Sequence, residues 1–251
     1  MKLVVDELSV RFGDTLAVDK VSFAVGETER LGIIGASGSG KSVTSLAIAG
    51  LLSETARVSG SIKFDGQELV GLRERDYRRL RGNRFSMIFQ EPMTALDPTM
   101  RVGLQIAEAI ALHDRRTGKR LTVEEELQRV GITDPGRVAD SFPHQLSGGQ
   151  RQRAMIAMAI VNKPDLVICD EPTTALDMVV QRNILHVLDD VLTDRAALFI
   201  SHDLGVVREV CPRVIVMQEG HIVEEGPIDA VIAAPAHDYT ARLVAAARGE
   251  L

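Results

Sequence analysis

The sequence predicts an α/β fold: a mixed sheet with helices, an antiparallel β subdomain and an inserted helical subdomain. Apolar runs of strand length occur at 31–34, 166–169 and 197–200; the first leads into a glycine-rich stretch, and the other two end in polar residues. Such runs are typical of buried strands in a sheet that helices cover. Residues 3–11 and 18–25 instead alternate apolar and polar residues around a Gly13-Asp14 turn, which predicts antiparallel strands. The inserted part has helical spacing at 102–112, 121–130 and 151–161.

The other elements follow from local signals in chain order. Residues 29–34 are expected to form the strand that leads into a helix at 43–52. A run of six arginines begins at residue 73. Further strands are expected at 60–66, 85–89, 214–217 and 222–223, and further helices at 178–192 and 228–251. Turn glycines separate the short strands, and Pro235 is expected to break the last helix.

The composition is that of a globular protein with a sizeable core. The chain has 251 residues, 45% of them hydrophobic and 25% charged, which suits one α/β domain with an inserted subdomain. A net charge of -6 gives no general attraction to nucleic acid. The arginine run at 73–84 therefore predicts a solvated helix face, with a local nucleic-acid patch as the alternative. No nucleic-acid partner is expected.

Two features bear on location. No apolar run approaches the roughly 18 to 20 residues that a membrane-spanning helix needs, and Met1 leads directly into a strand pattern and not into a signal peptide. We therefore expect a cytosolic chain unless a partner holds it at a membrane. The two cysteines, Cys169 in a strand pattern and Cys211 before a proline, are expected to be reduced and structural.

The spacing of residues 35–42 predicts a phosphate-binding loop between a strand and a helix. Its glycines allow backbone N–H groups to turn toward anionic oxygens, and the following helix adds the positive end of its dipole. Lys41 would reach the β- and γ-phosphates, and Ser42 would bind Mg²⁺. The alternative is a flexible Gly/Ser turn, which the flanking strand and helix disfavour. The expected phosphate-binding residues are Gly35, Ala36, Ser37, Gly38, Ser39, Gly40, Lys41, Ser42 and Val43.

A second helix start suits an anion at residues 146–150. Ser147, Gly148 and Gly149 precede a long helix, and such a start presents unpaired N–H groups. A Ser-Gly-Gly cap alone carries little weight. It matters here because one chain rarely needs two such sites unless phosphate is held from two sides.

Polar residues end three strand patterns. Asp170 and Glu171 follow the apolar run at 166–169, where Asp170 is placed to hold Mg²⁺ and Glu171 to polarise an attacking water. Two exposed acids in a turn are the alternative. Gln90 ends the strand at 85–89, and His202 ends the strand at 197–200 as a candidate γ-phosphate contact. Phe12 is equally compatible with base stacking and with a place in the core.

The order of these motifs resembles one family. Residues 35–42, 90, 146–150, 166–171, 175–177 and 202 match, in order, the Walker A, Q-loop, signature, Walker B, D-loop and H-loop motifs. The chain thus resembles an ATP-binding-cassette (ABC) ATPase over essentially its whole length. This resemblance implies a P-loop NTPase core with a RecA-like mixed sheet. The phrases at 89–98, 142–146 and 237–240 are similar to those of oligopeptide, dipeptide and nickel importer ATPases.

The resemblance implies roles for the motif residues. Two cassettes would meet head to tail, so that ATP on the Lys41 loop of one is closed over by the signature of the other. The expected catalytic residues are Glu171, His202, Gln90 and Lys41, and the expected magnesium ligands are Ser42, Gln90 and Asp170. The expected nucleotide contacts beyond the phosphate loop are Phe12, where the family usually has tyrosine, and Ser147, Gly148, Gly149, Gln150 and Asp177.

The resemblance also implies domain boundaries and partners. The nucleotide-binding core would comprise residues 1–89 and 162–235, the helical signature subdomain 90–161, and a helical tail 236–251. Transmembrane permease subunits, an extracytoplasmic solute-binding protein and a second ATPase subunit would be the partners, at the cytoplasmic face of the membrane. The solute is expected to be a peptide or a related small solute, nickel included. The alternatives are an assembly subunit of a phosphonate-processing complex or another soluble ABC ATPase.

Overall fold

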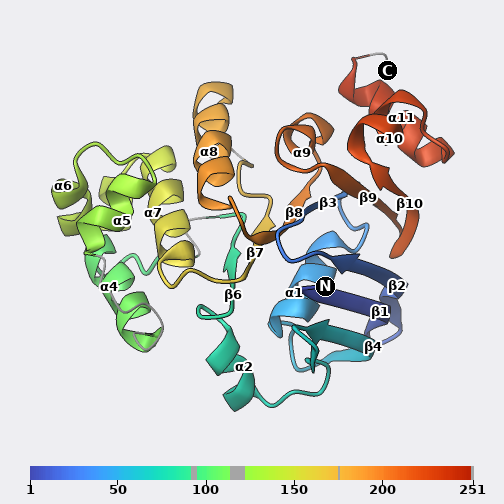
Figure 1. Cartoon of the computed structure of the whole chain (residues 1–251), viewed down its shortest axis with the longest axis horizontal. Helices are drawn as coiled ribbons and strands as arrows, with labels where there is room; N and C mark the ends of the chain where they lie inside the picture. The colour runs from blue at the N-terminus through green and yellow to red at the C-terminus, as the bar shows by residue number, and fades with distance from the viewer. Residues whose placement is uncertain (92–94, 114–121, 175, 250–251) are drawn as a thin grey trace. The chain divides into compact units, whose positions relative to one another are not determined.

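The computed structural model describes residues 1–91, 95–113, 122–174 and 176–249 (Figure 1). The chain divides into two compact units, one of residues 1–78 and 194–251 and one of residues 79–193. The predicted boundaries of core, helical subdomain and tail stay a prediction. Within the described ranges, no helix is both long and apolar enough to cross a membrane.

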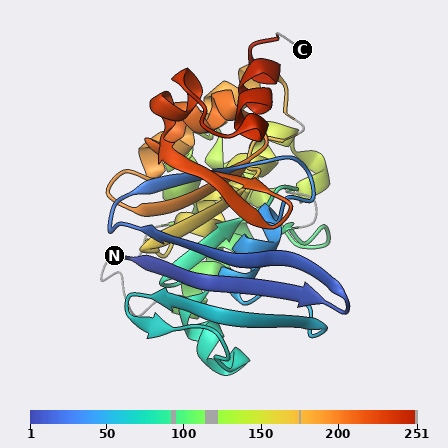
Figure 2. The ribbon, with the colours of Figure 1, turned by 90° about the vertical axis from the view of Figure 1, so that its right-hand side faces the viewer.

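The first unit contains an antiparallel sheet in the order β2-β1-β4-β5, whose strands lie side by side in Figure 2. These strands are β1 (Leu3–Phe12), β2 (Thr15–Val25), β4 (Ala56–Phe64) and β5 (Gln67–Glu68). In β1, Leu3 and Val5 are buried, and so are Leu8 and Val10; the period of two holds within each pair and changes phase at the register shift between Val5 and Leu8. The predicted antiparallel strand pair at the N-terminus is confirmed.

Strand β4 begins four residues before the predicted start at Gly60. The pairing of β1 with β4 shifts register between Asp6 and Ser9, and Glu7 lies in this interval with a φ of 45°. Gly60 has a φ of 91°, and a Cβ there would lie 2.4 Å from the Glu7 carbonyl oxygen. The glycine therefore marks a bulge inside the strand, where close backbone approach excludes a side chain.

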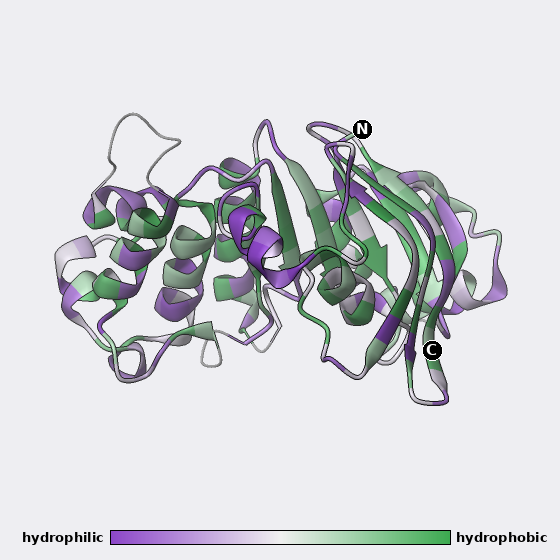
Figure 3. Cartoon of the chain, turned by 90° about the horizontal axis from the view of Figure 1, so that it is seen from below, coloured by the Kyte–Doolittle hydropathy of each residue, from purple (hydrophilic) through white to green (hydrophobic). Residues whose placement is uncertain are grey.

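A second set of strands in the first unit carries the phosphate loop. Strand β3 (Arg30–Ile34) pairs in parallel with β8 (Ala196–Ser201) and β9 (Arg213–Gln218), and β10 (His221–Pro227) pairs with β9 as the expected hairpin. The core strands β3 and β8 are buried along their length except at Arg30, and the strands in the middle of Figure 3 are coloured mainly green, for hydrophobic residues. The helices of this unit are α1 (Lys41–Ala49), α9 (Leu204–Val210), α10 (Ile228–Ala233) and α11 (Asp238–Ala247).

Arg213, at the start of β9, ties three parts of the first unit together. Its Nε donates to Glu29 at 2.6 Å, while its two Nη atoms donate to Glu225 of β10 and to the Ala24 carbonyl of β2. The planar guanidinium suits such a fork of acceptors. Partial burial acts to lower the pKa of Arg213, but the hydrogen bond and charge of Glu29, with the charge of Glu225, outweigh it and raise the pKa.

The second unit is a parallel strand pair with helices. Strand β6 (Phe85–Ile88) pairs with β7 (Leu166–Asp170), and at their start Arg84 Nε donates to Asp165 at 2.5 Å. The helices are α4 (Val102–His113), α5 (Val123–Arg129), α6 (Pro135–Asp140), α7 (Gly148–Ile160) and α8 (Met178–Val191), with a 3₁₀ turn at Pro143–Gln145. Helix α7 packs against β6, α4, α5 and α8. The expected inserted helices are thus present.

Helix α2 (Glu74–Leu80) lies where the chain passes from the first unit to the second. The side chains of Arg73 and Arg78 are exposed, and each lies near a carboxylate of the same segment, Asp76 at 3.1 Å and Glu74 at 3.2 Å. Arg73 and Arg78 thus lie on a solvated face with acidic partners close by, whereas Arg84, the last arginine of the run, is part-buried beside Asp165.

Both cysteines are buried and neither is part of a disulfide, as expected. Burial raises the pKa of the Cys211 thiol to about 12, so it stays protonated at neutral pH. Short helices α6 and α9 lie outside the sequence prediction because six or seven residues give little periodicity. Their start signals, Asp134 and Asp203, accept hydrogen bonds from their first turns.

Gly32 in β3 provides a test of this packing. A Cβ there would lie 2.3 Å from Val207 Cγ1 of α9, so Gly32→Ala overpacks the layer between α9 and β3. Overpacking typically costs about 1–3 kcal/mol, which lowers the melting temperature by several degrees in a chain of this size. Circular dichroism on heating measures the shift. Gly136→Ala in α6 is the control, because a Cβ there meets no atom within 4 Å; equal melting temperatures for the two variants would contradict the packing argument.

Candidate functional site

The predicted phosphate loop joins β3 to α1 and leaves no room for side chains at two of its glycines. A Cβ at Gly35 would lie 2.3 Å from the Met217 carbonyl oxygen, and a Cβ at Gly40 would lie 2.9 Å from the Ala17 carbonyl oxygen. Gly38 and Gly40 also have φ values of 79° and 101°, in the region that favours glycine. Neighbouring backbone therefore encloses the loop, and glycine is required by space as well as by conformation.

Lys41 is buried at the first position of α1 and points back onto the loop. Its Nζ donates to the Gly35 carbonyl at 2.8 Å and to the Ala36 carbonyl at 2.9 Å. An ammonium group has three donors and no acceptor, so these neutral carbonyls are acceptors that phosphate oxygens can replace with stronger bonds. The charge that the sequence predicted for phosphate contact is thus inside the loop.

The start of α1 differs from the starts of α8 and α9. Asp177 caps α8 by accepting from Val179 and Val180, and Asp203 caps α9 by accepting from Gly205. Helix α1 is preceded by Gly40 and has no side-chain cap. A helix start without a capping carboxylate suits an external anion, because the dipole and the first N–H groups favour negative charge.

Two contacts that the sequence analysis did not foresee hold the loop in place. Gly220, in the turn between β9 and β10, donates its N–H to the Ser39 carbonyl at 3.1 Å and accepts from Asp19 at 2.9 Å. The Tyr239 hydroxyl of α11 accepts the N–H of Ala36 at 2.7 Å. The only sequence signals were the turn glycine and the phrase at 237–240, neither of which gives its partner.

His202 and Phe12 complete the candidate residues of the first unit. Ser201 stands opposite Ile34 in the parallel pairing of β8 with β3, so His202 follows β8 at the level where the phosphate loop begins. His202 is exposed. Phe12 ends β1, opposite Thr15, and is half-buried. A half-buried ring is compatible both with stacking on a nucleobase and with a place in the core.

In the second unit, the structure brings Gln90 and Glu171 together. Gln90 Nε2 lies 3.4 Å from Glu171 Oε2, and Thr174 Oγ1 donates to the same oxygen at 2.8 Å. Asp170 is buried at the end of β7, whereas Glu171 is half-buried and has a φ of 48°. A left-handed backbone at a glutamate costs about 1 kcal/mol or more, and such strain is typical of functional positions.

The chain after Glu171 is fixed from helix α7. Gln152, which is buried, donates to the Pro172 carbonyl at 2.5 Å. Sequence analysis gave no role to Gln152 or to Thr174, because a single polar residue in a helix or turn carries no signal of its partner. Both contacts restrict the backbone on which the Glu171 carboxylate is carried.

The predicted second anion site is the start of α7. Ser147 caps this helix: its Oγ accepts from Gln150 N at 3.3 Å, and Gln150 Oε1 accepts from Ser147 N at 3.1 Å. The helix therefore begins at Gly148, directly after its capping residue Ser147 and three residues before the predicted start.

A hollow of about 390 Å³ adjoins this start; its lining residues are Ser147, Gly148, Gly149, Gln150, Arg153, Leu176, Asp177, Val180 and Asn183. Ala175 of the D-loop motif lies outside the described residues, as do residues 92–94 of the phrase after Gln90 and residues 114–121.

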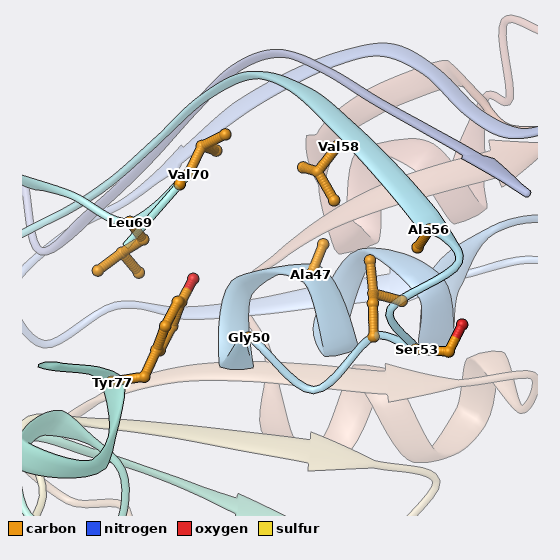
Figure 4. A pocket seen from close by; sticks show the side chains of 10 residues that line it. Ala47, Gly50, Ser53, Ala56, Val58, Leu69, Val70 and Tyr77 are labelled. Atoms are coloured by element: carbon orange, nitrogen blue, oxygen red, sulfur yellow. The ribbon is translucent and has the colours of Figure 1, made fainter. Parts of the chain in front are cut away.

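Another hollow, of about 180 Å³, lies in the first unit beside the end of α1 (Figure 4). Its lining includes Ala47, Val58, Leu69 and the ring of Tyr77. Gly50 faces this ring so closely that a Cβ would lie 2.5 Å from it. The lining contains none of the predicted site residues, so this hollow is separate from the candidate site.

The family model described as ABC transporter matches residues 18–174. A probable peptide ABC transporter ATP-binding protein of Sinorhizobium fredii is 51% identical, over 92% of this chain and 70% of that protein. The dipeptide transport ATP-binding protein DppD of Escherichia coli is 46% identical, over 97% and 77%. A peptidoglycan transport ATP-binding protein of Agrobacterium fabrum is 48% identical, over 97% of this chain and 46% of its own length.

Solved structures agree with these relatives. The ATP-binding cassette MJ0796, in a dimeric post-hydrolysis state bound to ADP and Pi, has a TM-score of 0.77 at 25% identity, covering 90% of this chain and 98% of its own. The cbiO1 protein of Clostridium perfringens, part of the ABC transporter complex cbiONQ, has a TM-score of 0.75 at 27% identity, covering 98% and 94%. The predicted fold class and the suspected subfamily are confirmed. The chain belongs to the ABC transporter family, as an ATP-binding subunit with ATPase activity.

Proposed function

We propose that this ATPase powers the import of peptides. The observation that carries the proposal is the 46–51% identity, over nearly the whole chain, to proteins named for peptide and dipeptide transport. An assembly role beside a phosphonate-processing complex has no comparable support. The choice among peptides, or between peptides and another small solute such as nickel, lies with partner proteins.

The partners would be transmembrane permease subunits, an extracytoplasmic solute-binding protein and a second ATPase subunit, either a copy of this chain or a paralogue. The dimeric state of the cassette MJ0796 supports the second ATPase subunit. The ATPase subunits of such a transporter would lie at the cytoplasmic face of the membrane. The solute-binding protein and the exact location rest on the resemblance to importer ATPases.

ATP would be held by the phosphate loop of residues 35–43. The uncapped start of α1 offers N–H groups, and the Lys41 ammonium, which donates to the Gly35 and Ala36 carbonyls, would donate to phosphate oxygens. The donor set expected for Mg²⁺, namely the Ser42 hydroxyl, the Gln90 amide and the Asp170 carboxylate, consists of the oxygens that Mg²⁺ prefers. When bound, Mg²⁺ neutralises charge that develops on the transferred phosphoryl group.

Glu171 would orient the water that attacks the γ-phosphorus. Its carboxylate lies beside Gln90 and accepts from Thr174, so its orientation is fixed before substrate arrives. His202 would contact the γ-phosphoryl group, and Ser147, Gly148 and Gly149 would close over the ATP of the second subunit. Binding of ATP would close the dimer and hydrolysis would reopen it.

Reconstitution tests the transport proposal. The chain is co-expressed with peptide-permease subunits from the same genome, purified as a complex and placed in liposomes. We expect ATPase activity to rise when the cognate solute-binding protein is loaded with peptide. Stimulation by nickel or another solute but not by peptides would overturn the peptide assignment, and failure to co-purify with any permease would overturn the transport assignment.

Lys41→Ala tests the phosphate loop. Loss of the ammonium removes charge-assisted hydrogen bonds, each worth about 1.5–3 kcal/mol, so ATP affinity should fall by at least about tenfold and turnover should be lost. Titration with a fluorescent ATP analogue measures the affinity. Lys163→Ala, which changes an exposed lysine outside the motifs, is the control. Unchanged ATP affinity in Lys41→Ala would show that another group binds the phosphates.

Glu171→Gln tests the water-orienting role. The substitution keeps the shape of the side chain and removes its charge, so ATP should still bind while the hydrolysis rate falls by roughly 10²- to 10³-fold. Gel filtration with ATP and Mg²⁺ should show the dimer accumulating, because it closes and does not reopen. A variant that hydrolyses ATP at the parental rate would remove Glu171 from the mechanism.

Ser147→Arg tests whether hydrolysis needs two chains. A long cationic side chain at the start of α7 should block closure over a partner's ATP, reducing turnover at least about tenfold, and leave the chain's own ATP affinity within about twofold. Both quantities are measured on one preparation. Loss of affinity together with turnover would mean that the signature contacts its own nucleotide. A rate per chain that stays constant across protein concentration would remove the need for a partner.

A further inference from the structure

We propose that Tyr239, at the start of α11, is a positioning residue of the ATP site. It is outside the six motifs, about 200 positions from the phosphate loop, yet its hydroxyl oxygen accepts the N–H of Ala36 at 2.7 Å. Ala36 is the second residue of that loop. The proposal goes beyond peptide transport, because it concerns how this chain shapes its loop for ATP whatever the solute is.

Tyr239 and Lys41 hold the same peptide unit from opposite sides. The peptide that joins Gly35 to Ala36 offers one carbonyl and one N–H; Lys41 Nζ binds the carbonyl at 2.8 Å and Tyr239 binds the N–H at 2.7 Å. In a planar trans peptide these two groups point in opposite directions. Rotation of this peptide would therefore break both contacts at once.

The phenol is itself held in place by the segment before it. Glu224 of β10 accepts the N–H groups of Ala236 at 2.9 Å and His237 at 3.0 Å, and His237 Nδ1 then accepts from Tyr239 N at 3.1 Å. Partial burial acts to raise the pKa of Glu224, but the hydrogen bonds from Ala236 and His237 contribute to a lowered pKa. An ionised carboxylate therefore fixes the backbone that carries Tyr239.

The contact gains importance when ATP binds. Phosphate oxygens then compete for the Lys41 ammonium, so its hold on the Gly35 carbonyl weakens while the Tyr239 hydroxyl keeps its hold on the other side of the peptide. Without the hydroxyl, the peptide is free to reorient, and ATP binding must order it. A contact that helps to bind ATP equally in the ground state and the transition state affects KM and not kcat, so the effect should appear in KM.

Tyr239→Phe removes the hydroxyl and keeps the ring. A hydrogen bond of ordinary net strength corresponds to a loss of about three- to tenfold in ATP affinity, with a matching rise in KM and an unchanged kcat. Fluorescent ATP titration and steady-state ATPase assays measure these values. The melting temperature without ATP should stay that of the parent, and the stabilisation by ATP should be smaller. A purely structural role of Tyr239 would instead lower the melting temperature measured without ATP.

Tyr77→Phe is the matched control, since the chain has two tyrosines and Tyr77 lines the separate hollow of Figure 4. Its ATP affinity should equal that of the parent. Parental affinity in a folded Tyr239→Phe variant, or an equal loss in Tyr77→Phe, would overturn the proposal.

Glu224→Gln tests the support of Tyr239. We expect it to weaken ATP binding through the same contact, so that adding it to Tyr239→Phe causes little further loss. Two losses that multiply in the double variant would show that Glu224 acts by another route and would overturn this part of the proposal.

Discussion

Close backbone approach around the phosphate loop is the constraint on which the first unit depends. Carbonyl groups of Ala17 and Met217 lie so near Gly40 and Gly35 that no side chain fits between them. The loop is thus enclosed by β2 and β9, segments that the chain reaches about 20 residues before it and about 180 residues after it. The last two strands, through Met217 and the turn at Gly220, therefore shape the loop together with its own sequence.

In the second unit, the main constraint is the orientation of the Glu171 carboxylate. Glu171 has an unfavourable backbone conformation, and contacts from Thr174 and Gln90 to its side chain, with one from Gln152 to the next residue, maintain it. Such a residue keeps its place only where the surroundings determine it. At the other end of the strand pair, the hydrogen bond from Arg84 to Asp165 joins the starts of β6 and β7.

Much of the fold and most candidate residues could be predicted from the sequence, because the signals were local. Short apolar runs predicted β3, β7 and β8, and alternation of apolar and polar residues predicted β1 and β2. The predicted start of β4 was wrong because Gly60 lies in a bulge inside the strand, opposite Glu7, which is about 50 residues away in the sequence. Contacts such as Tyr239 with Ala36 were out of reach for the same reason: a single polar residue does not specify a partner 203 positions away.

The bonds of Lys41 to its own loop have a consequence for ligand choice. Because the ammonium already donates to two carbonyls, the acceptors of a ligand compete with them, and the affinity reflects how much stronger the new bonds are. Neutral acceptors on an uncharged nucleoside are no better than the carbonyls they would displace, whereas anionic phosphate oxygens are about twice as strong. The ammonium of Lys41 thus favours a ligand that carries phosphate over a neutral molecule of the same shape.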